Sequence, residues 1–374
     1  MMRLDALSLT QFRSYEQLDV AFRDADVHVF LGPNGAGKTN LLEAVSVLST
    51  GHSFLAAEER DLMQWGRDYY RLRGRVRADN GEEKTVEVAS QCVPSVRRAC
   101  YVNDVRSPVG RLTGVLPSVA FLPQDLSLFT GSPARRRALL NDLLVQVSPA
   151  FAQSLSVYGK ALKQRNALLQ KIAEGTGRPQ DLSVWDASIA QEGARITLAH
   201  LELLKVLQCT LREELVALGE TWSAVHLSYE RKGEAVTEEG IYEELLAALQ
   251  HYRERDIIIG ATTVGPHRHD WRMEADGRAL QSFASRGQQR TAVLALLFLE
   301  ISYLELARGE KPVVLLDDVF SELDPERQSR LLEVLGSHQV LLTATHLPPR
   351  IGGAMVWEVG TGVLSPKTTA PVHS

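Results

Sequence analysis

The sequence predicts an α/β fold that contains an antiparallel β subdomain and an inserted α-helical lobe. Strand-like segments occur near both ends of the chain, with LDALSLTQF and VHVFL at the start and KPVVLLDDVF and QVLLTATH near the end. A block rich in Ala, Leu, Glu, Lys and Gln, with helical periodicity, separates them. We therefore expect one domain built from residues 1–123 and 257–374, with a helical second lobe at 124–256.

Composition and charge exclude several classes of protein. The 374 residues are 44% apolar, and the formal net charge of −5 argues against a uniformly basic coat while permitting a local basic face. The three cysteines match no metal-ligand spacing, and the start of the chain lacks the apolar block of a signal peptide. The longest apolar stretch, near Val293 to Leu299, is well short of the roughly 20 residues that a membrane span needs. We expect a cytoplasmic protein with no membrane partner.

The individual elements follow from local patterns. RLRGRVRADNGEEKTVEVASQ is typical of a hairpin that turns at Asn80-Gly81, and RRACYVNDVRSP of a second one that turns near Asn103-Asp104. A helix is expected in TNLLEAVSVLS, and further helices are predicted at 133–147, 149–174, 181–218 and 238–251. The segment DIIIGATTVG predicts a strand, and we expect the tail from about Pro366 to be frayed.

The segment GPNGAGKT follows the strand VHVFL directly and leads into a helix. It has the pattern G-x-x-x-x-G-K-[ST] in the structural order that this pattern requires, which predicts a phosphate-binding loop. Glycines let the backbone fold around an anion, and the exposed N–H groups and the helix N-terminus bind phosphate oxygens. Lys38 is expected on the β- and γ-phosphates and the Thr39 hydroxyl on Mg²⁺. The nucleotide-binding residues are Gly32, Pro33, Asn34, Gly35, Ala36, Gly37, Lys38 and Thr39.

The segment VVLLDD predicts a buried parallel strand with two carboxylates at its carboxyl end. Ligands bind at that edge in open α/β sheets, so both carboxylates are expected to meet the phosphate loop. Asp317 is the predicted Mg²⁺ ligand, and Asp318 the general base that polarises the attacking water. Many ATPases of this shape carry Glu at the second position, and Asp is shorter by about 1.5 Å, so we expect slow hydrolysis.

Four further pieces appear in a fixed order along the chain: FLPQD, ASRGQQR, SELD and ATH. Each alone is compatible with a cap, a turn or a strand end, but together with the phosphate loop they resemble the ATP-binding-cassette head. The resemblance implies that Ser285, Gly287 and Gln288 complete the site of a second copy, with Ser285 on the γ-phosphate. It also implies that Gln124 senses metal and water, that His346 contacts the γ-phosphate, and that Asp324 lies near the dimer axis.

A closer resemblance spans nearly the whole chain. LTQFRSY, TGHSF, YGKALKQRNALL, GPHRHD and LLDDVFSELD resemble the RecF family of bacterial recombination mediators. The resemblance implies an ABC/SMC-type ATPase head that binds ATP and Mg²⁺, dimerises with ATP and binds DNA. It implies action with RecR and RecO to promote RecA loading at single-strand gaps. Arg13 and Ser14 of the FRSY segment are then expected near the adenine or its phosphates.

Two other members of the cassette superfamily remain as alternatives. A transporter-type ATPase would bind membrane subunits, but its head has no room for the helical block between Gln124 and Ser285. An architectural SMC-like protein would tether DNA and hydrolyse ATP incidentally; here the inserted lobe makes a short arm. Association with membrane subunits would favour the transporter, and gap-dependent recruitment with a small zinc-binding partner would favour the mediator.

A row of arginines marks a candidate DNA surface. Arg71, Arg73, Arg75 and Arg77 alternate with smaller residues, so a strand would place all four on one face. The row would either track phosphates or form the solvated outer face of a hairpin. Lys160 and Lys163, three residues apart on a predicted helix, are a second candidate, with Arg165 nearby, and Arg135-Arg136-Arg137 a third. We expect contact that is independent of sequence, on duplex or gap-junction DNA.

Overall fold

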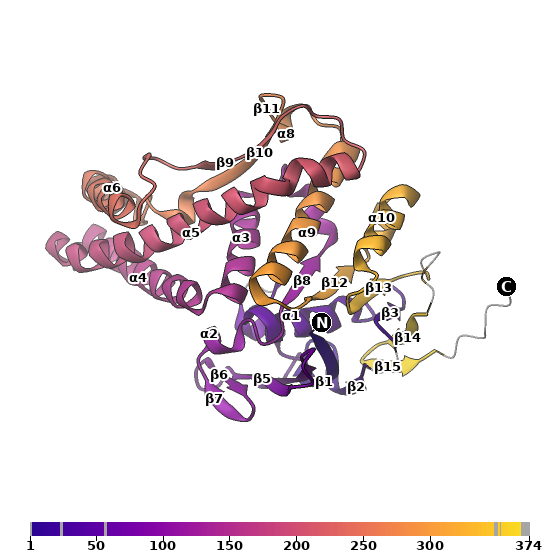
Figure 1. The fold of residues 1–374 in the computed structure, drawn as a ribbon. Coiled ribbons are helices and arrows are strands. Elements are labelled where there is room, and N and C mark those ends of the chain that lie inside the picture. Colours follow the sequence, from indigo (N-terminus) through magenta and orange to yellow (C-terminus); the bar gives the residue numbers. More distant parts are fainter. Residues whose placement is uncertain (1, 23–24, 56–57, 348–350, 352, 368–374) are drawn as a thin grey trace. The chain divides into compact units, whose positions relative to one another are not determined.

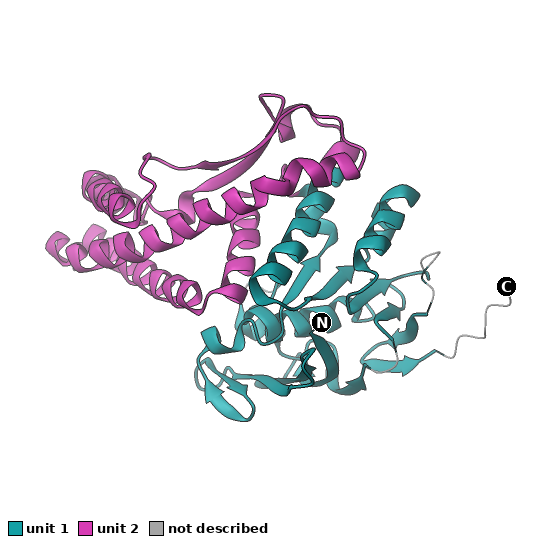
Figure 2. Cartoon of the chain, viewed as in Figure 1, with its two compact units in different colours: residues 1–127, 290–374 teal, residues 128–289 magenta. Residues whose placement is uncertain are grey.

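The chain forms two compact units that are built around three β-sheets. The computed structural model describes residues 2–22, 25–55, 58–347, 351 and 353–367. The first unit consists of residues 1–127 and 290–374, and the second of residues 128–289 (Figures 1 and 2). Each unit has its own sheets and helices, so each is described by itself.

The first unit contains an antiparallel sheet of order β2-β1-β4-β5-β6-β7. Its strands are β1 (Arg3–Phe12), β2 (Tyr15–Ala21), β4 (Tyr69–Arg77), β5 (Glu83–Gln91), β6 (Arg97–Val102) and β7 (Val105–Ser107). Both predicted hairpins are confirmed: β4 pairs with β5 and β6 with β7. Asn103 and Asp104 turn the second hairpin with positive φ angles of 51° and 61°, which Asn and Asp tolerate better than most residues.

The second sheet of this unit is mixed and has the order β15-β14-β3-β13-β12-β8. Its strands are β3 (Val27–Leu31), β8 (Ser118–Phe121), β12 (Val313–Asp317), β13 (Val340–Ala344), β14 (Met355–Gly360) and β15 (Val363–Pro366). All neighbours pair in parallel except β14 and β15. β12 is buried at every residue, as its continuous apolar run predicts for a central parallel strand. β13 lies between β3, which precedes the predicted phosphate loop, and β12, which carries the predicted acidic pair.

Helix α1 (Lys38–Thr50) contacts both of these sheets. Nearly all its residues are buried, as expected of a helix that is apolar on most sides and packs against two sheets. The unit also contains α2 (Val109–Leu112), α10 (Pro325–Leu335) and most of α9 (Arg286–Arg308), whose first residues belong to the second unit. Short 3₁₀ helices occur at η1 (Glu59–Leu62), η2 (Pro123–Ser127) and η5 (Val319–Glu322).

The second unit is mainly helical, as predicted. Its helices are α3 (Pro133–Val147), α4 (Pro149–Ala173), α5 (Leu182–Ala217), α6 (Glu238–His251), α7 (Arg253–Ile259) and α8 (Leu280–Phe283), with η3 (Pro179–Asp181) and η4 (Pro266–Arg268). A small sheet of order β11-β10-β9 accompanies them, formed by β9 (Val225–Glu230), β10 (Asp270–Ala275) and β11 (Arg278–Ala279). The long helix α5 packs on α4, α6 and β9.

The strand predicted in DIIIGATTVG is wrong, because Asp256 to Ile259 form the end of helix α7. Three consecutive isoleucines have high strand propensity, but Ile258 is 84% exposed and lies in no sheet. The helix ends at Gly260, whose φ of 71° gives the left-handed cap that glycine supplies.

The boundary between the two units differs from the one that the sequence suggested. The units change near residue 127, close to the expected 123, but the return to the first unit is at residue 290 rather than 257. The reason is that β10 pairs with β9, which ties residues 270–275 to the helical unit.

Two further expectations concern the chain as a whole. Pro366 ends β15 and the Lys367 N–H donates to the Val356 carbonyl, so the tail is ordered at least to that point; residues 368–374 lie outside the described residues. Among the residues that the structure describes, no helix is both long and apolar enough to cross a membrane.

Candidate functional site

The loop after β3 folds as the sequence pattern predicts. It connects the carboxyl end of β3 to α1, and Lys38, the first helical residue, is only 7% exposed. Its ammonium donates to the carbonyls of Gly32 at 2.8 Å and Pro33 at 3.0 Å. The loop therefore holds a positive charge at its centre, beside the N-terminus of a buried helix, and both features favour an anion.

The three glycines of this loop are required for different reasons. A Cβ atom on Gly32 would lie 2.5 Å from the Val359 carbonyl oxygen of β14, which is too close for any side chain. Gly37 has a φ of 102°, and a Cβ there would lie 2.5 Å from the Ser14 hydroxyl. Gly35 has open space around it but a φ of 81°, so its constraint is the backbone conformation.

The loop and the acidic strand end meet, as expected. The Thr39 hydroxyl lies 2.9 and 3.0 Å from the two carboxylate oxygens of Asp317. The strand between them, β13, contributes Thr343, whose hydroxyl donates to Asp317 at 2.6 Å. Asp317 is 9% exposed, so its charge is largely removed from water and stabilised by these hydroxyl donors. Hydroxyl and carboxylate oxygens are the ligands that Mg²⁺ prefers in proteins.

Asp318 differs from its neighbour in conformation and environment. Its backbone is left-handed, with a φ of 50°, and its N–H donates to the Thr343 hydroxyl and carbonyl at 3.0 and 3.1 Å. Partial burial raises the pKa of the Asp318 carboxyl, and the nearby Lys38 ammonium opposes that rise. A carboxylate with a raised pKa is a better proton acceptor, which suits a general base.

A depression of about 310 Å³ brings these groups together. It is lined by the phosphate loop, by Asp317, Asp318 and Thr343, and by Pro123, which directly precedes Gln124. His346 follows β13 and is close enough to Asp318 to influence the pKa of that carboxyl. Asp324 caps helix α10 by accepting the Arg327 N–H at 3.0 Å, and this bond lowers the pKa of the Asp324 carboxyl.

Side-chain hydrogen bonds connect the FRSY turn between β1 and β2 to helix α1. Arg13 donates to both carboxylate oxygens of Glu43 at 2.6 and 2.7 Å, and Glu43 is fully buried. Asn40 donates to the Ser14 hydroxyl at 3.0 Å, and the Tyr15 hydroxyl donates to the Gly37 carbonyl at 3.1 Å. The structure thus places Ser14 against the phosphate loop, whereas Arg13 is held by Glu43.

Sequence reasoning missed Glu43, Asn40 and Thr343. Glu43 lies on the most buried helix of the first unit, and a buried carboxylate requires a partner, which was the available signal. Thr343 follows the apolar residues of β13 in a segment whose apolar pattern predicts only a buried strand. No signal in the sequence connects it to Asp317.

Ser285, Gly287 and Gln288 lie at the start of α9, in the part of the chain that belongs to the second unit. The Ser285 N–H donates to the Gln288 side chain at 3.0 Å, and the Gln288 N–H donates to the Ser285 hydroxyl at 3.2 Å. This reciprocal pair is a capping box, and Ser285 is exposed. A Cβ on Gly287 would come no closer than 3.8 Å to any neighbour. Packing within the chain therefore does not explain this glycine.

The four arginines of β4 do share one face, but most of their charge is paired. Arg71 and Arg73 contact Glu87 at 2.8 and 3.6 Å, and Arg73 also contacts Asp104 at 2.9 Å. Arg77 pairs with Asp5 at 2.8 Å. Only Arg75 has no ion pair among the described residues, so the row is much less cationic than its sequence suggests.

The other basic candidates divide into exposed and buried groups. Lys160 and Lys163 are exposed on α4, and neither has an ion pair with a described residue. Arg165, the nearby arginine of the same helix, is fully buried between Asp186 and Asp256 and cannot contact DNA. Arg136 is likewise held, by Asp270 at 2.8 Å.

Comparisons with known proteins place the chain in a family. The model of the RecF/RecN/SMC N-terminal domain matches residues 3–346. The DNA replication and repair protein RecF of Heliobacterium modesticaldum is 36% identical over 97% of this chain and 99% of its own length. The chain belongs to the RecF family.

Solved structures agree with that assignment. A structure of the recombination mediator protein RecF with ATP in the RecFOR pathway superposes with a TM-score of 0.86, at 31% identity and 98% coverage of both chains. The Smc head domain of Pyrococcus furiosus, with its extended coiled coil, has a TM-score of 0.53 at 15% identity, covering 98% of this chain and 96% of its own. The fold is therefore that of an ABC/SMC-type ATPase head with an antiparallel β subdomain and an inserted helical lobe.

Proposed function

We propose that the chain is an ATP-dependent, DNA-binding recombination mediator that works as an ATP-induced dimer. The observation that carries the proposal is the contact between Thr39 and Asp317 beside the loop that contains Lys38. A RecF protein of the same family has been solved with ATP bound. The first unit is the ATPase head in this proposal, and the second is the helical lobe.

ATP would bind with its phosphates in the loop of residues 32–39. Lys38 would turn from the loop carbonyls to the β- and γ-phosphates, and Ser14 would lie beside the loop near the nucleotide. Mg²⁺ fits the oxygens of Thr39 and Asp317, and it would neutralise phosphate charge when bound. The phosphate oxygens of the nucleotide would complete the ligand set that Thr39 and Asp317 begin.

Hydrolysis would be slow in this chain. Asp318 would accept a proton from the attacking water. Gln124 follows Pro123, which lines the same depression, and His346 is close enough to Asp318 to influence its pKa, so both would act beside it. The shorter Asp side chain leaves its oxygens about 1.5 Å further from the phosphate than Glu would, which weakens alignment.

ATP would act as a dimerisation switch. Ser285, Gly287 and Gln288 of one copy would close on the γ-phosphate of the other, and loss of that phosphate would release the dimer. The space around Gly287 supports this proposal, because a residue without a side chain permits a close approach from outside the chain. Asp324 would lie near the dimer axis.

Three variants test the switch. Lys38→Ala should abolish ATP binding, whereas Ser285→Ala and Gly287→Ala should bind ATP but not dimerise. Gly287→Ala is the sharpest, because alanine fits the monomer and favours helix, so the folded monomer should be unharmed. Sedimentation velocity with ATP measures dimerisation. Normal dimerisation of both Ser285→Ala and Gly287→Ala would contradict the proposal.

The proposed partners are DNA, RecR and RecO, with RecA loading at single-strand gaps in the cytoplasm as the result. The ATP-bound RecF relative is described as part of the RecFOR pathway. We assign the same partners to this chain because it belongs to the same family. Recruitment to gapped DNA should require ATP and RecR. A chain that tethers DNA equally well without RecR would favour the architectural SMC-like alternative.

A further inference from the structure

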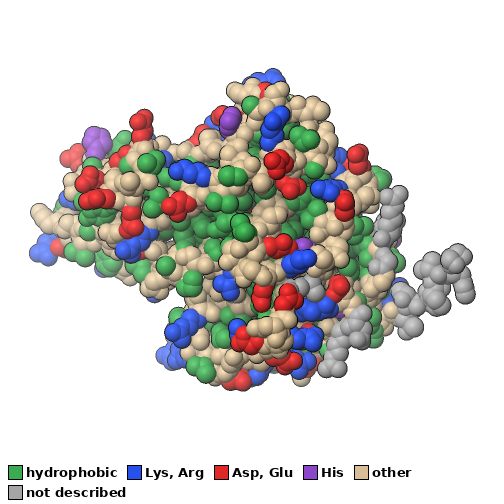
Figure 3. All heavy atoms as spheres, in the orientation of Figure 1, with side chains coloured by type: hydrophobic (Ala, Val, Ile, Leu, Met, Phe, Trp, Pro, Cys, Tyr) green, Lys and Arg blue, Asp and Glu red, His purple; other side chains and the backbone are tan. Residues whose placement is uncertain are grey.

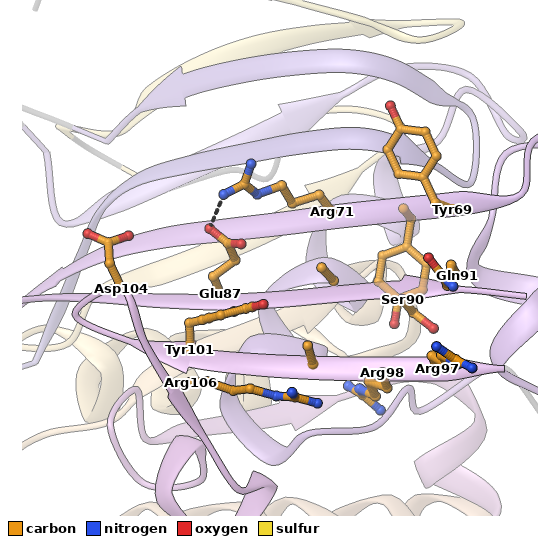
Figure 4. Close-up of a pocket in the computed structure, with 13 residues that line it drawn as sticks. Tyr69, Arg71, Glu87, Ser90, Gln91, Arg97, Arg98, Tyr101, Asp104 and Arg106 are labelled. Atoms are coloured by element: carbon orange, nitrogen blue, oxygen red, sulfur yellow. Dashed lines mark hydrogen bonds and ion pairs between the residues drawn. The ribbon is translucent and has the colours of Figure 1, made fainter.

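The outer face of the antiparallel sheet has a depression of about 670 Å³, which shares no lining residue with the depression at the phosphate loop (Figure 4). The strand register places Arg71, Ala89 and Ala99 side by side across β4, β5 and β6. Side chains two residues apart on a strand share a face, so the two alanines form a floor between longer side chains. The depression follows directly from those two small residues.

Longer side chains border the floor on both sides. Gln91 and Arg97 pair at the end of the sheet nearer Tyr69, and Glu87, Tyr101 and Arg106 align across β5, β6 and β7 on the other side. In Figure 4 the side chains of Tyr101 and Arg106 extend along the strands toward the end that carries Arg97. An aromatic ring and two guanidinium groups therefore border one shallow trough.

The charges of the trough are unequally satisfied. Arg71 donates to Glu87 at 2.8 Å, and Arg98 contacts Glu59 at 3.4 Å. Arg97 and Arg106 are exposed, and neither side chain forms an ion pair or hydrogen bond with a described residue. Two guanidinium groups with open donors suit a ligand that carries repeated anionic groups, since each guanidinium can donate two parallel hydrogen bonds to one anionic group.

Exposed aromatic surface adjoins the same end of the sheet. Tyr69, the first residue of β4, is 46% exposed, and Trp65, in the turn four residues earlier, is 99% exposed. The exposed rings of Tyr69 and Trp65 offer aromatic faces on which a base can stack.

We propose that this face binds a single strand of nucleic acid. One base would lie over the alanine floor against Tyr101, with phosphates on Arg97 and Arg106, and the strand would continue past Tyr69 toward Trp65. The proposal rests on the proposed DNA-binding function and deepens it, because it names the surface and the residues that would hold the strand. Alternating aromatic and cationic groups are the usual means of holding single strands without reading their sequence.

Two other occupants fit less well. Duplex DNA hides its base faces, so it would leave Tyr101 and Trp65 uncovered and use only the cationic groups. An acidic peptide would bring its carboxylates close to Glu87 and Asp104, both of which line the trough. A nucleotide avoids that repulsion over the floor, because its planar base is uncharged.

The test compares variants for binding of a short fluorescein-labelled oligothymidylate and of a blunt duplex, by anisotropy with ATP present. Tyr101→Ala should weaken single-strand binding about tenfold. The double variant Arg97→Ala/Arg106→Ala should lower the slope of log affinity against log salt by about 1.4. Ala99→Val keeps both arginines, suits a strand and fills the floor, so it should also weaken the oligothymidylate. Arg178→Ala, an exposed arginine in the other unit, should change nothing.

The outcomes separate this inference from the function on which it rests. If the wild type binds both DNA probes and all three trough variants bind the oligothymidylate normally, the trough is not a single-strand site, and the mediator function stands. If the trough variants lose duplex and single-strand binding equally, or if they lose binding only of a labelled glutamate-rich peptide, the inference is overturned. If the wild type binds no DNA with ATP, the proposed function fails and this inference with it.

Discussion

Asp318 combines a left-handed backbone with a raised side-chain pKa, and both follow from its place at the end of a buried strand. Asp318→Asn removes the proton acceptor and keeps the shape. We expect hydrolysis to fall by about 10²–10⁴-fold while ATP affinity changes little. Because the carboxyl must be ionised to act, the acid limb of the wild-type rate should lie at higher pH than for an ordinary aspartate. Single-turnover hydrolysis across pH measures both; an unchanged rate in the variant would exclude Asp318 as the base.

Thr343 makes a second prediction at the residue scale. It is fully buried, its hydroxyl donates to Asp317, and it accepts the Asp318 N–H, so it orients both acids at once. Thr343→Val has nearly the same shape but no hydroxyl. We expect a lower kcat and a higher Mg²⁺ requirement with nearly unchanged ATP binding, and recovery in Thr343→Ser. Titration of hydrolysis with Mg²⁺ measures this, and a valine variant with wild-type Mg²⁺ dependence would show that the hydroxyl positions nothing.

At the scale of elements, one buried guanidinium joins three helices of the second unit. Arg165 of α4 donates to Asp186 of α5 and Asp256 of α7, each at 2.7 Å, with all three residues at most 1% exposed. Arg165→Ala leaves the buried Asp256 carboxylate without its cation and Asp186 with Arg253 alone, so the free energy of unfolding should fall by about 3–5 kcal/mol. Arg178→Ala breaks an exposed pair with Asp181 and should cost less than about 1 kcal/mol. Urea unfolding of both variants makes the comparison, and similar losses would contradict the account.

Buried histidines of the same unit predict a pH dependence. Burial lowers the pKa of His200 to about 3 and that of His269 to about 3, and both rings contact the Tyr229 hydroxyl. In the unfolded chain a histidine titrates near pH 6.5. Their folded pKa values are depressed, so stability is full above about pH 6.5 and is lost as pH falls, by up to about 1.4 kcal/mol per pH unit for each ring.

Urea unfolding between pH 8 and pH 5.5 measures that dependence. His200→Gln should be less stable at pH 8, because it loses its bonds to Tyr229 and Asn141, but its stability should fall less steeply with pH. A variant with the wild-type slope would assign the pH dependence to other groups.

Most helices and strands could be predicted from the sequence, because their periodicity and turn residues agree with their final surroundings. The exceptions depend on distant partners. The isoleucines after Asp256 form a helix because that aspartate is drawn into the ion pair with Arg165, about 90 residues earlier, which no local pattern reveals. The C-terminal boundary of the helical unit depends on a distant partner in the same way, since the pairing of Trp271 with Tyr229 is non-local.

The candidate site shows the same division. Lys38, Thr39 and Asp317 could be predicted because their spacing encodes a chemistry that any such loop shares. Thr343, Glu43 and the pairing of the β4 arginines could not, because they depend on which strand lies next to which. The sequence of β4 alone predicts a cationic row, but Glu87 on the neighbouring strand neutralises part of that charge.

At the scale of the whole molecule, charge limits how DNA can bind. The net charge is −5, and on the face shown in Figure 3 the basic and acidic side chains are interspersed. A monomer therefore offers few phosphate contacts, and closure of a dimer would double them. We expect DNA affinity to rise steeply with protein concentration when ATP is present and to be weak with ADP. Anisotropy titrations with both nucleotides measure this; equal affinity with ADP would uncouple DNA binding from dimerisation.

The hydrogen bonds that Arg13 and Ser53 donate to Glu43 determine which segments of the ATPase head move together. They make the β1–β2 turn, helix α1 and the segment that follows that helix into one cooperative body, since none can shift without stranding a fully buried anion. Amide hydrogen exchange should therefore slow together in all three when a nucleotide fills the loop. In Glu43→Gln, whose amide cannot hold the guanidinium as firmly, the turn should exchange independently of the helix.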